Sequence, residues 1–298
     1  MRPAWSVILL TTLIGAGQGL FLALVGVEAL SGAGKDFFVF GAAISLIFLG
    51  AGLVASFFHL GHPERAWRSA AKWRTSWLSR EVIALPAFMA AVFAWGAAHW
   101  LGWPTRALAA AGVVLALALY VCTGMIYACL RFLQEWHSPL TVVNYVVLGC
   151  ASGFTLAAAY AAWAAPALAP ALAAAALGWT LAGLATRSAS LMRNARLKAR
   201  SSLQSAIGVK HPRIAQKAQG AIAGSFNTRE FFHGRGPGTL RAVKWLFLAG
   251  AFVLPAALVV AGFLASAFVV QFAGLMAERW FFFAQANHPQ NFYYRTVS

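Results

Sequence analysis

The sequence predicts an all-α integral membrane protein with eight transmembrane helices, and three observations carry this prediction. Of its 298 residues, 61% are hydrophobic and only 10% are charged. The mean hydropathy is +0.71, and several apolar runs reach the roughly 20 residues that a helix needs to cross about 30 Å of hydrocarbon. The charges gather in windows between these runs and do not mark one face of every helix, as they would in a soluble protein.

The expected spans, in order along the chain, are 5–30, 37–58, 80–101, 106–132, 139–163, 166–187, 241–262 and 263–283. The first run has only Arg2 before it and no small-residue cleavage site, so we expect a retained helix and not a signal peptide. Gly15 and Gly19 form a small-xxx-small pair that predicts close helix packing in this span. The last two spans share an unbroken apolar stretch of 43 residues, which is too long for one crossing and predicts a tight turn near Gly262.

The distribution of basic residues predicts the orientation. With eight spans, 21 of the 23 Lys and Arg residues fall on one side, and only Lys35 and Arg106 fall on the other. Because cytoplasmic loops carry the excess of Lys and Arg, we expect both termini in the cytoplasm. The net charge of +16 is explained by this topology, so we expect membrane lipids and no nucleic acid as partners.

We interpret residues 1–298 as a single membrane anchor domain with two basic cytoplasmic loops, 59–80 and 188–240. A segment as long as the second loop is usually functional, and we expect it to dock a partner protein. Its glycine-rich end lacks the preceding strand and the Gly-Lys-Ser/Thr ending of a phosphate-binding loop.

Six residues are candidates for partner docking because they combine positive charge with apolar anchors: Arg65, Arg68, Arg229, Phe231, Phe232 and His233. Contact with lipid headgroups is the alternative for the group at 229–233.

The candidate quinone site lies where the first of these loops meets its helices. His59 ends the second span and Glu81 begins the third, and helices joined by one loop are usually neighbours. Quinone reduction consumes two electrons and two protons, which a histidine and a partly desolvated glutamate can relay. Arg80 or Arg74 would stabilise negative charge on the quinone. The alternative is that His59 is interfacial and that Glu81 only favours the helix dipole behind a Ser79 cap.

Other cofactors and functions have little support. The three cysteines, Cys122, Cys129 and Cys150, lie in apolar runs and are too few to ligate an iron–sulfur cluster, so we expect small buried side chains. No histidine lies well inside a span, which argues against haem. A transporter would place ionisable groups near the middle of the membrane. Glu28, near the outer surface, either belongs to a proton path or faces water, and Arg279 either snorkels or lines a cavity.

The segments 59–63 (HLGHP), 65–67 (RAW) and 76–81 (SWLSRE) resemble the DMSO reductase anchor subunit (DmsC) family. This resemblance implies an eight-helix subunit without haem that binds ubiquinone or menaquinone. It also implies a complex with a molybdopterin catalytic subunit and a four-cluster iron–sulfur subunit, whose cofactors lie outside this chain. The family's quinone-site histidine and glutamate would correspond to His59 and Glu81.

The segments 204–209 (QSAIGV), 226–233 (FNTREFFH), 278–283 (ERWFFF) and 288–291 (HPQN) are similar to anchor subunits of cytoplasmic sulfite dehydrogenases. This likeness implies oxidation of sulfite to sulfate by a partner, with electrons passed to quinone in a bacterial inner membrane and the partner on the cytoplasmic side. Two alternatives stay open: a purely structural anchor, and an anchor for a related enzyme with another substrate.

Overall fold

The computed structural model describes residues 1–30, 32–198, 200, 202–214 and 233–289. Across these residues the protein is all-helical, with no strand. Eight helices are long and apolar enough to cross a membrane, which makes this a multi-pass membrane protein and confirms the expected span count.

Six spans are α1 (Trp5–Leu30), α2 (Lys35–Phe57), α3 (Trp77–Leu101), α4 (Arg106–Ala128), α5 (Pro139–Ala164) and α6 (Ala169–Ala195), the last preceded by the 3-10 turn η2 (Pro166–Leu168). The seventh is built from α9 (Pro237–Leu248), the π-helical turn η3 (Ala249–Val253) and α10 (Leu254–Val260), and the eighth is α11 (Leu264–Ala284). Besides η2, the described residues form two short helices in the loops between spans: η1 (Pro63–Lys72), a 3-10 helix, and α7 (Leu203–Ile207). The expected turn is present at Gly262, whose φ of 83° requires the left-handed region that glycine enters freely.

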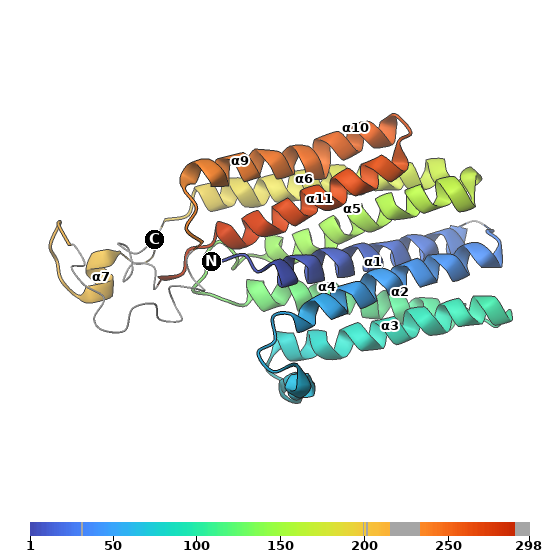
Figure 1. Ribbon diagram of the computed structural model, residues 1–298, viewed down its shortest axis with the longest axis horizontal. Coiled ribbons are helices and arrows are strands. Elements are labelled where there is room, and N and C mark those ends of the chain that lie inside the picture. The colour runs from blue at the N-terminus through green and yellow to red at the C-terminus, as the bar shows by residue number, and fades with distance from the viewer. Residues whose placement is uncertain (31, 199, 201, 215–232, 290–298) are drawn as a thin grey trace.

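The spans form two adjoining groups of four (Figure 1). In the first, α1 to α4 pack in sequence order, and in the second, α5, α6, α10 and α11 do so. The helices α1 and α5 lie at the centre, because α1 contacts α5 and α11 across the boundary and α4 contacts α5. The segments η1 and α7 lie at one end of the bundle, together with the start of α1 and the last turn of α11 (Figure 1). We call this the loop end and the opposite end the far end.

Glycines let the central helices approach closely. A Cβ atom added to Gly153 of α5 would lie 2.2 Å from the carbonyl carbon of Gly19 on α1, and one added to Gly19 would lie 2.4 Å from the oxygen of Gly149. No side chain fits at such distances, so the backbones of α1 and α5 touch directly. This contact confirms that the small residues of the first span serve packing.

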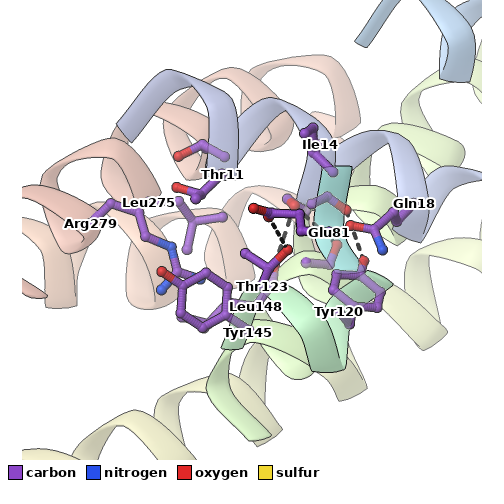
Figure 2. Close-up of a pocket in the computed structure, with 14 residues that line it drawn as sticks. Thr11, Ile14, Gln18, Glu81, Tyr120, Thr123, Tyr145, Leu148, Leu275 and Arg279 are labelled. Atoms are coloured by element: carbon purple, nitrogen blue, oxygen red, sulfur yellow. Dashed lines mark hydrogen bonds between the residues drawn. The ribbon is translucent and has the colours of Figure 1, made fainter. Parts of the chain in front are cut away.

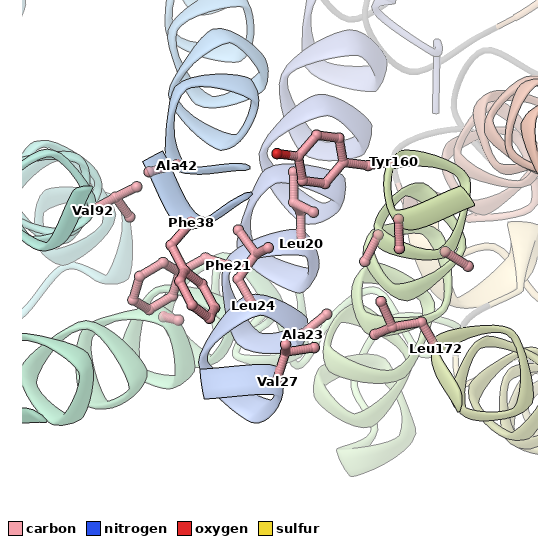
Figure 3. Close-up of a cluster of buried hydrophobic side chains, with 14 of the residues drawn as sticks. Leu20, Phe21, Ala23, Leu24, Val27, Phe38, Ala42, Val92, Tyr160 and Leu172 are labelled. Carbon is pink, nitrogen blue, oxygen red and sulfur yellow. The ribbon is translucent and has the colours of Figure 1, made fainter. Parts of the chain in front are cut away.

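The largest apolar core lies toward the far end, among α1 to α6, with contributions from α10 and α11 (Figure 3). Phe21 packs edge-on against Phe88 and Trp95, with ring centroids 5.4 and 5.3 Å apart. Phe37 stacks on Tyr160 at 4.9 Å. This half of the bundle is held together by close packing of aromatic and aliphatic side chains.

Two local expectations were wrong. Cys129 is exposed at the C-terminal end of α4, whereas Cys122 and Cys150 are buried as expected. The span expected to end at Arg187 continues to Ala195, because Arg187 is buried against an acidic partner inside the bundle and does not lie at the interface.

Candidate functional site

A small polar cavity lies inside the bundle between α1, α3, α4, α5 and α11 (Figure 2). Its polar side chains include Thr11, Gln18, Glu81, Thr123, Tyr145 and Arg279. The cavity has a volume of about 20 Å³, and about 10 to 15 Å³ is enough for one water molecule. The site therefore has room for one or two water molecules.

Glu81 is the carboxylate in this cavity. The helix α3 begins at Trp77, and its cap is Ser76, whose hydroxyl accepts a hydrogen bond from the Ser79 backbone amide at 3.4 Å. Ser79 is therefore not the cap, and Glu81 lies beyond the first turn, where the helix dipole is no longer its main reason to be there. Glu81 is 8% exposed, and the Thr123 hydroxyl donates a hydrogen bond to Glu81 Oε1 at 2.5 Å. A buried carboxylate with one hydroxyl partner and a cavity beside it points to proton chemistry.

The uncharged polar groups of the cavity are mostly bound to the backbone. Gln18 Nε2 donates to the Ala116 oxygen at 2.8 Å, and the Tyr120 hydroxyl donates to the Gly15 oxygen at 2.8 Å. These bonds tie α1 to α4 and fix the cavity wall. Glu81 and Arg279 are the charged groups that face the cavity.

Arg279 belongs to a buried cluster of three charges. Its guanidinium carbon lies 3.9 Å from the centre of the Tyr145 ring, a cation–π contact, and Nη1 lies 3.5 Å from Glu278 Oε2. On the other side, Arg187 Nε of α6 lies 2.6 Å from Glu278 Oε1. All three side chains are buried. Two arginines and one glutamate leave this cluster with one positive charge, which an ionised Glu81 across the cavity balances.

His59, Arg80 and Arg74 do not line this cavity and lie in or beside the loop. His59 is exposed just beyond α2, and partial desolvation lowers the pKa of its imidazole. Arg80 Nε donates to the Trp73 oxygen at 2.9 Å, and Nη2 donates to the Arg74 oxygen at 2.9 Å. Arg80 thus fastens the loop to the start of α3. Within the part of the chain that the structure describes, no hydrogen bond joins His59 to Glu81.

The candidate docking residues of the first loop form an exposed surface. Arg65 and Arg68 lie on η1, which buries no residue. Arg68 stacks over Trp67 at 5.5 Å, and Trp67 is 71% exposed.

Of the second docking group, His233 is half-buried, with its ring centre 6.4 Å from that of Trp280 on α11. Desolvation lowers the pKa of His233. Arg229, Phe231 and Phe232 fall outside the described residues.

With this geometry in place, the comparisons with known proteins identify the family. A family model described as the DMSO reductase anchor subunit (DmsC) matches residues 1–284. The chain belongs to this family. Membership of the DMSO reductase anchor family implies catalytic and electron-transfer partner subunits, as the resemblance in the sequence predicted.

A named relative is also similar over its whole length. The C subunit of sulfite dehydrogenase from Allochromatium vinosum is 53% identical over 325 aligned residues, which cover 100% of both chains. The expected likeness to anchor subunits of sulfite dehydrogenases is thus confirmed.

The site contains residues that sequence reasoning did not select for this anchor subunit. Arg187 and Glu278 were not candidates, and Arg279 had two interpretations, of which cavity lining is the one observed. The sequence did carry a signal, because an acidic and a basic residue inside an apolar span are costly unless they are paired. Thr123 and Tyr145 carried no such signal, since hydroxyl groups are common in membrane helices.

Proposed function

We propose that this protein is the membrane anchor and quinone-reactive subunit of a sulfite-oxidising molybdopterin complex. In this proposal it passes electrons from an iron–sulfur subunit to ubiquinone or menaquinone. The observation that carries the proposal is Glu81, a buried carboxyl group on a polar cavity next to the basic loop. The whole-length similarity to a sulfite dehydrogenase subunit favours sulfite as the substrate of the partner. The family description alone also fits an anchor for another substrate.

The cavity residues fit the proton half of quinone reduction. Bound quinone supplies an acceptor for two electrons and two protons. Glu81 holds a proton at its carboxyl group and releases it, while the Thr123 hydroxyl orients the carboxylate. His59 has a lowered pKa, so it is a neutral ring at pH 7 and exchanges protons at the surface of the loop.

The size of the cavity assigns different places to water and quinone. A space of about 20 Å³ holds water and not a substituted quinone ring. In our proposal the ring therefore docks outside the cavity, beneath η1, and Glu81 reaches it from the interior. Arg80 and Arg74 belong to the loop that covers this position, and Arg80 keeps the loop in place through its two backbone hydrogen bonds.

The loop end is the proposed cytoplasmic side and the proposed dock for the iron–sulfur subunit. By the span assignment from the sequence, 21 of the 23 Lys and Arg residues fall on the same side as the termini, and at the loop end Arg65 and Arg68 of η1 are exposed. In our proposal, which the positive-inside rule supports, both termini and the partner-facing surface lie on the cytoplasmic side of a bacterial inner membrane. Labelling with an impermeant thiol reagent in sealed inside-out vesicles tests this orientation. Cys129, at the loop end, should react, whereas a cysteine introduced by Trp103→Cys at the far end should not.

The deciding experiment compares two electron acceptors in the purified complex. We expect Glu81→Gln and His59→Ala to lose most sulfite-dependent reduction of a quinone analogue, while sulfite oxidation with an artificial acceptor and subunit assembly stay at the wild-type level. The matched controls are Glu64→Gln and His62→Ala, which change exposed residues of the same loop.

Full quinone reduction by both site variants would contradict the proposal. The chain would then be a structural anchor, with quinone bound elsewhere in the complex.

A further inference from the structure

A second polar cavity lies next to the Glu81 cavity, between α5, α6 and α11. It has a volume of about 10 Å³, which is close to the lower limit for one water molecule. Asn144, Arg187, Ser190 and Glu278 line its buried part. Arg279 lines both cavities, so they share part of one wall.

Buried polar atoms without hydrogen-bond partners line this second cavity. Asn144 donates through Nδ2 to the Ser190 hydroxyl at 2.7 Å, but its Oδ1 has no partner. Glu278 Oε2 and Arg187 Nη2 also lack hydrogen bonds, although both groups take part in ion pairs. These residues are 5%, 1% and 2% exposed, respectively. Buried groups of this kind are normally satisfied by ordered water, so the unpaired atoms indicate a hydrated cavity.

The outer part of the same cavity reaches the surface at the loop end. Glu135, Arg193 and Asn194 line it there and are each half-buried. Glu135 Oε1 accepts hydrogen bonds from the backbone and side-chain nitrogens of Asn287 at 3.3 and 3.1 Å. Arg193 donates to the backbone oxygens of Gln134 and His137. The arginine is therefore tied to the α4–α5 connection, and a carboxylate is present at the cavity mouth.

We propose that these two cavities form the proton inlet of Glu81, with Glu135 at the mouth and water held by Asn144 and Glu278 along the route. This inference rests on the proposed function. Reduction of one quinone to quinol takes up two electrons from the partner subunit and two protons, and each proton that Glu81 releases is replaced from the loop end through the inlet. Arg279 lies where the two cavities meet. Its positive charge is compensated there by Glu278, whose Oε2 lies 3.5 Å from Arg279 Nη1.

The groups around Glu81 are consistent with this direction of supply. The titratable or charged side chains of the Glu81 cavity are Tyr120 of α4, Tyr145 of α5 and Arg279 of α11, while α1 contributes the uncharged Thr11, Thr12 and Gln18. Cys122 and Tyr127 of α4 are the nearby titratable groups outside the cavity wall, and Arg80 precedes Glu81 on α3. Among these described neighbours, Arg279 alone also lines the second cavity.

The test blocks the inlet without touching Glu81. Asn144→Leu keeps the side-chain size but removes the polar atoms, and we expect it to slow sulfite-dependent quinone reduction about tenfold. The deficit should grow at alkaline pH, where protons are scarce, and the solvent deuterium isotope effect should rise. Glu135→Gln, which keeps an acceptor for Asn287 and does not change the buried region, should show the same pH and isotope pattern with a smaller loss of rate.

The matched control is Gln271→Leu on α11, which removes a buried amide that bonds to Thr180 at 2.9 Å outside both cavities. It should leave the pH profile and the isotope effect unchanged. If Glu81→Gln is inactive with quinone but Asn144→Leu and Glu135→Gln match this control, the inlet is overturned and the proposed function stands. If Glu81→Gln itself reduces quinone normally, the proposed function fails first.

Discussion

Each end of the bundle holds a glutamate bonded to side chains of other elements, and the two differ in exposure and in what surrounds them. At the far end, Glu28 accepts hydrogen bonds from Trp95 Nε1 at 3.0 Å and from the Thr105 hydroxyl, and His99 Nε2 lies 3.2 Å from its Oε1. At the loop end, Glu81 accepts a hydrogen bond from the Thr123 hydroxyl at 2.5 Å and borders a cavity. The partly exposed carboxylate of Glu28 is thus held by three protein groups, whereas the buried carboxylate of Glu81 has one hydroxyl partner and borders water-sized space.

The difference indicates two uses of the same side chain. Three partners from α3 and the α3–α4 connection make Glu28 a link between α1 and its neighbours. The stacking of Phe38 on His99 at 4.5 Å closes that end further. A carboxylate with fewer fixed donors changes protonation at lower cost, because water can reorganise where fixed dipoles cannot.

The largest effect is expected from the removal of one member of the buried charge cluster formed by Arg187, Glu278 and Arg279. Arg187→Leu leaves Glu278 buried with Arg279 at 3.5 Å as its remaining ion-pair partner in the cluster. Loss of one partner of a buried ion pair costs about 3 to 5 kcal/mol, and the contact that remains between Arg279 and Glu278 puts the expected cost at the lower end of this range. We expect the free energy of unfolding of the purified protein to fall by this amount, measured by chemical denaturation in detergent.

Arg196→Leu is the control for this variant, because Arg196 is exposed just after the same helix. Its unfolding free energy should change by less than about 1 kcal/mol. An equally small change for Arg187→Leu would mean that the cluster is solvated in the membrane and that the loop half of the bundle is wetter than the two cavities indicate.

Two substitutions with smaller expected effects each remove one hydrogen-bond donor from Glu28 or Glu81. Trp95→Phe removes a donor from Glu28, and Thr123→Val removes the donor from Glu81. A hydrogen bond to a charged group contributes about 1.5 to 3 kcal/mol. We expect Trp95→Phe to lower the unfolding free energy by about this amount and to leave quinone reduction unchanged, because the far end takes no part in it.

Thr123→Val should show the opposite pattern, with less loss of stability, since cavity water can replace the hydroxyl, and a clear loss of quinone reduction. Both quantities are measured on the same preparations by denaturation and by the quinone-analogue assay. The comparison fails if the two variants lose stability and activity in the same proportion.

The sequence predicted the architecture because a bilayer makes strong demands on a chain. Runs of about 20 apolar residues and one-sided basic loops are visible without any contact information, and even the turn at Gly262 followed from the length of one run. The helix ends were less accurate. The helix α6 continues beyond Arg187 because Glu278, on a helix far along the chain, neutralises that arginine.

The site was predicted only in part, for a related reason. Glu81 and His59 stood out as ionisable residues at helix ends, but the sequence did not show that Glu81 turns inward while His59 stays exposed. The residues that line the cavity with Glu81 come from α1, α4, α5 and α11, and contacts between distant spans leave no pattern in the local sequence. Thr123 and Tyr145 therefore became visible only when the helices were assembled.

The smallest expected effect concerns the surface of the loop end, where His59 is the titratable side chain proposed to act. Desolvation lowers its pKa below the ordinary 6.5, so in the window between the lowered value and 6.5 the unfolded chain binds a proton that the folded chain does not. Stability therefore increases with pH through this window, is fully present above it, and is lost as the pH falls. His59→Gln should flatten this dependence, by well under the about 1.4 kcal/mol that one pKa unit represents, because the exposed ring is screened by solvent.

Thermal unfolding of both proteins across this pH range measures the difference, with His62→Gln, an exposed histidine of the same loop, as the control. A wild-type curve that is as flat as that of His59→Gln would mean that the ring is fully hydrated. His59 would then lie too far outside the covered position beneath η1 to exchange protons with a docked quinone, and Glu81, supplied from the interior, would have to deliver both protons.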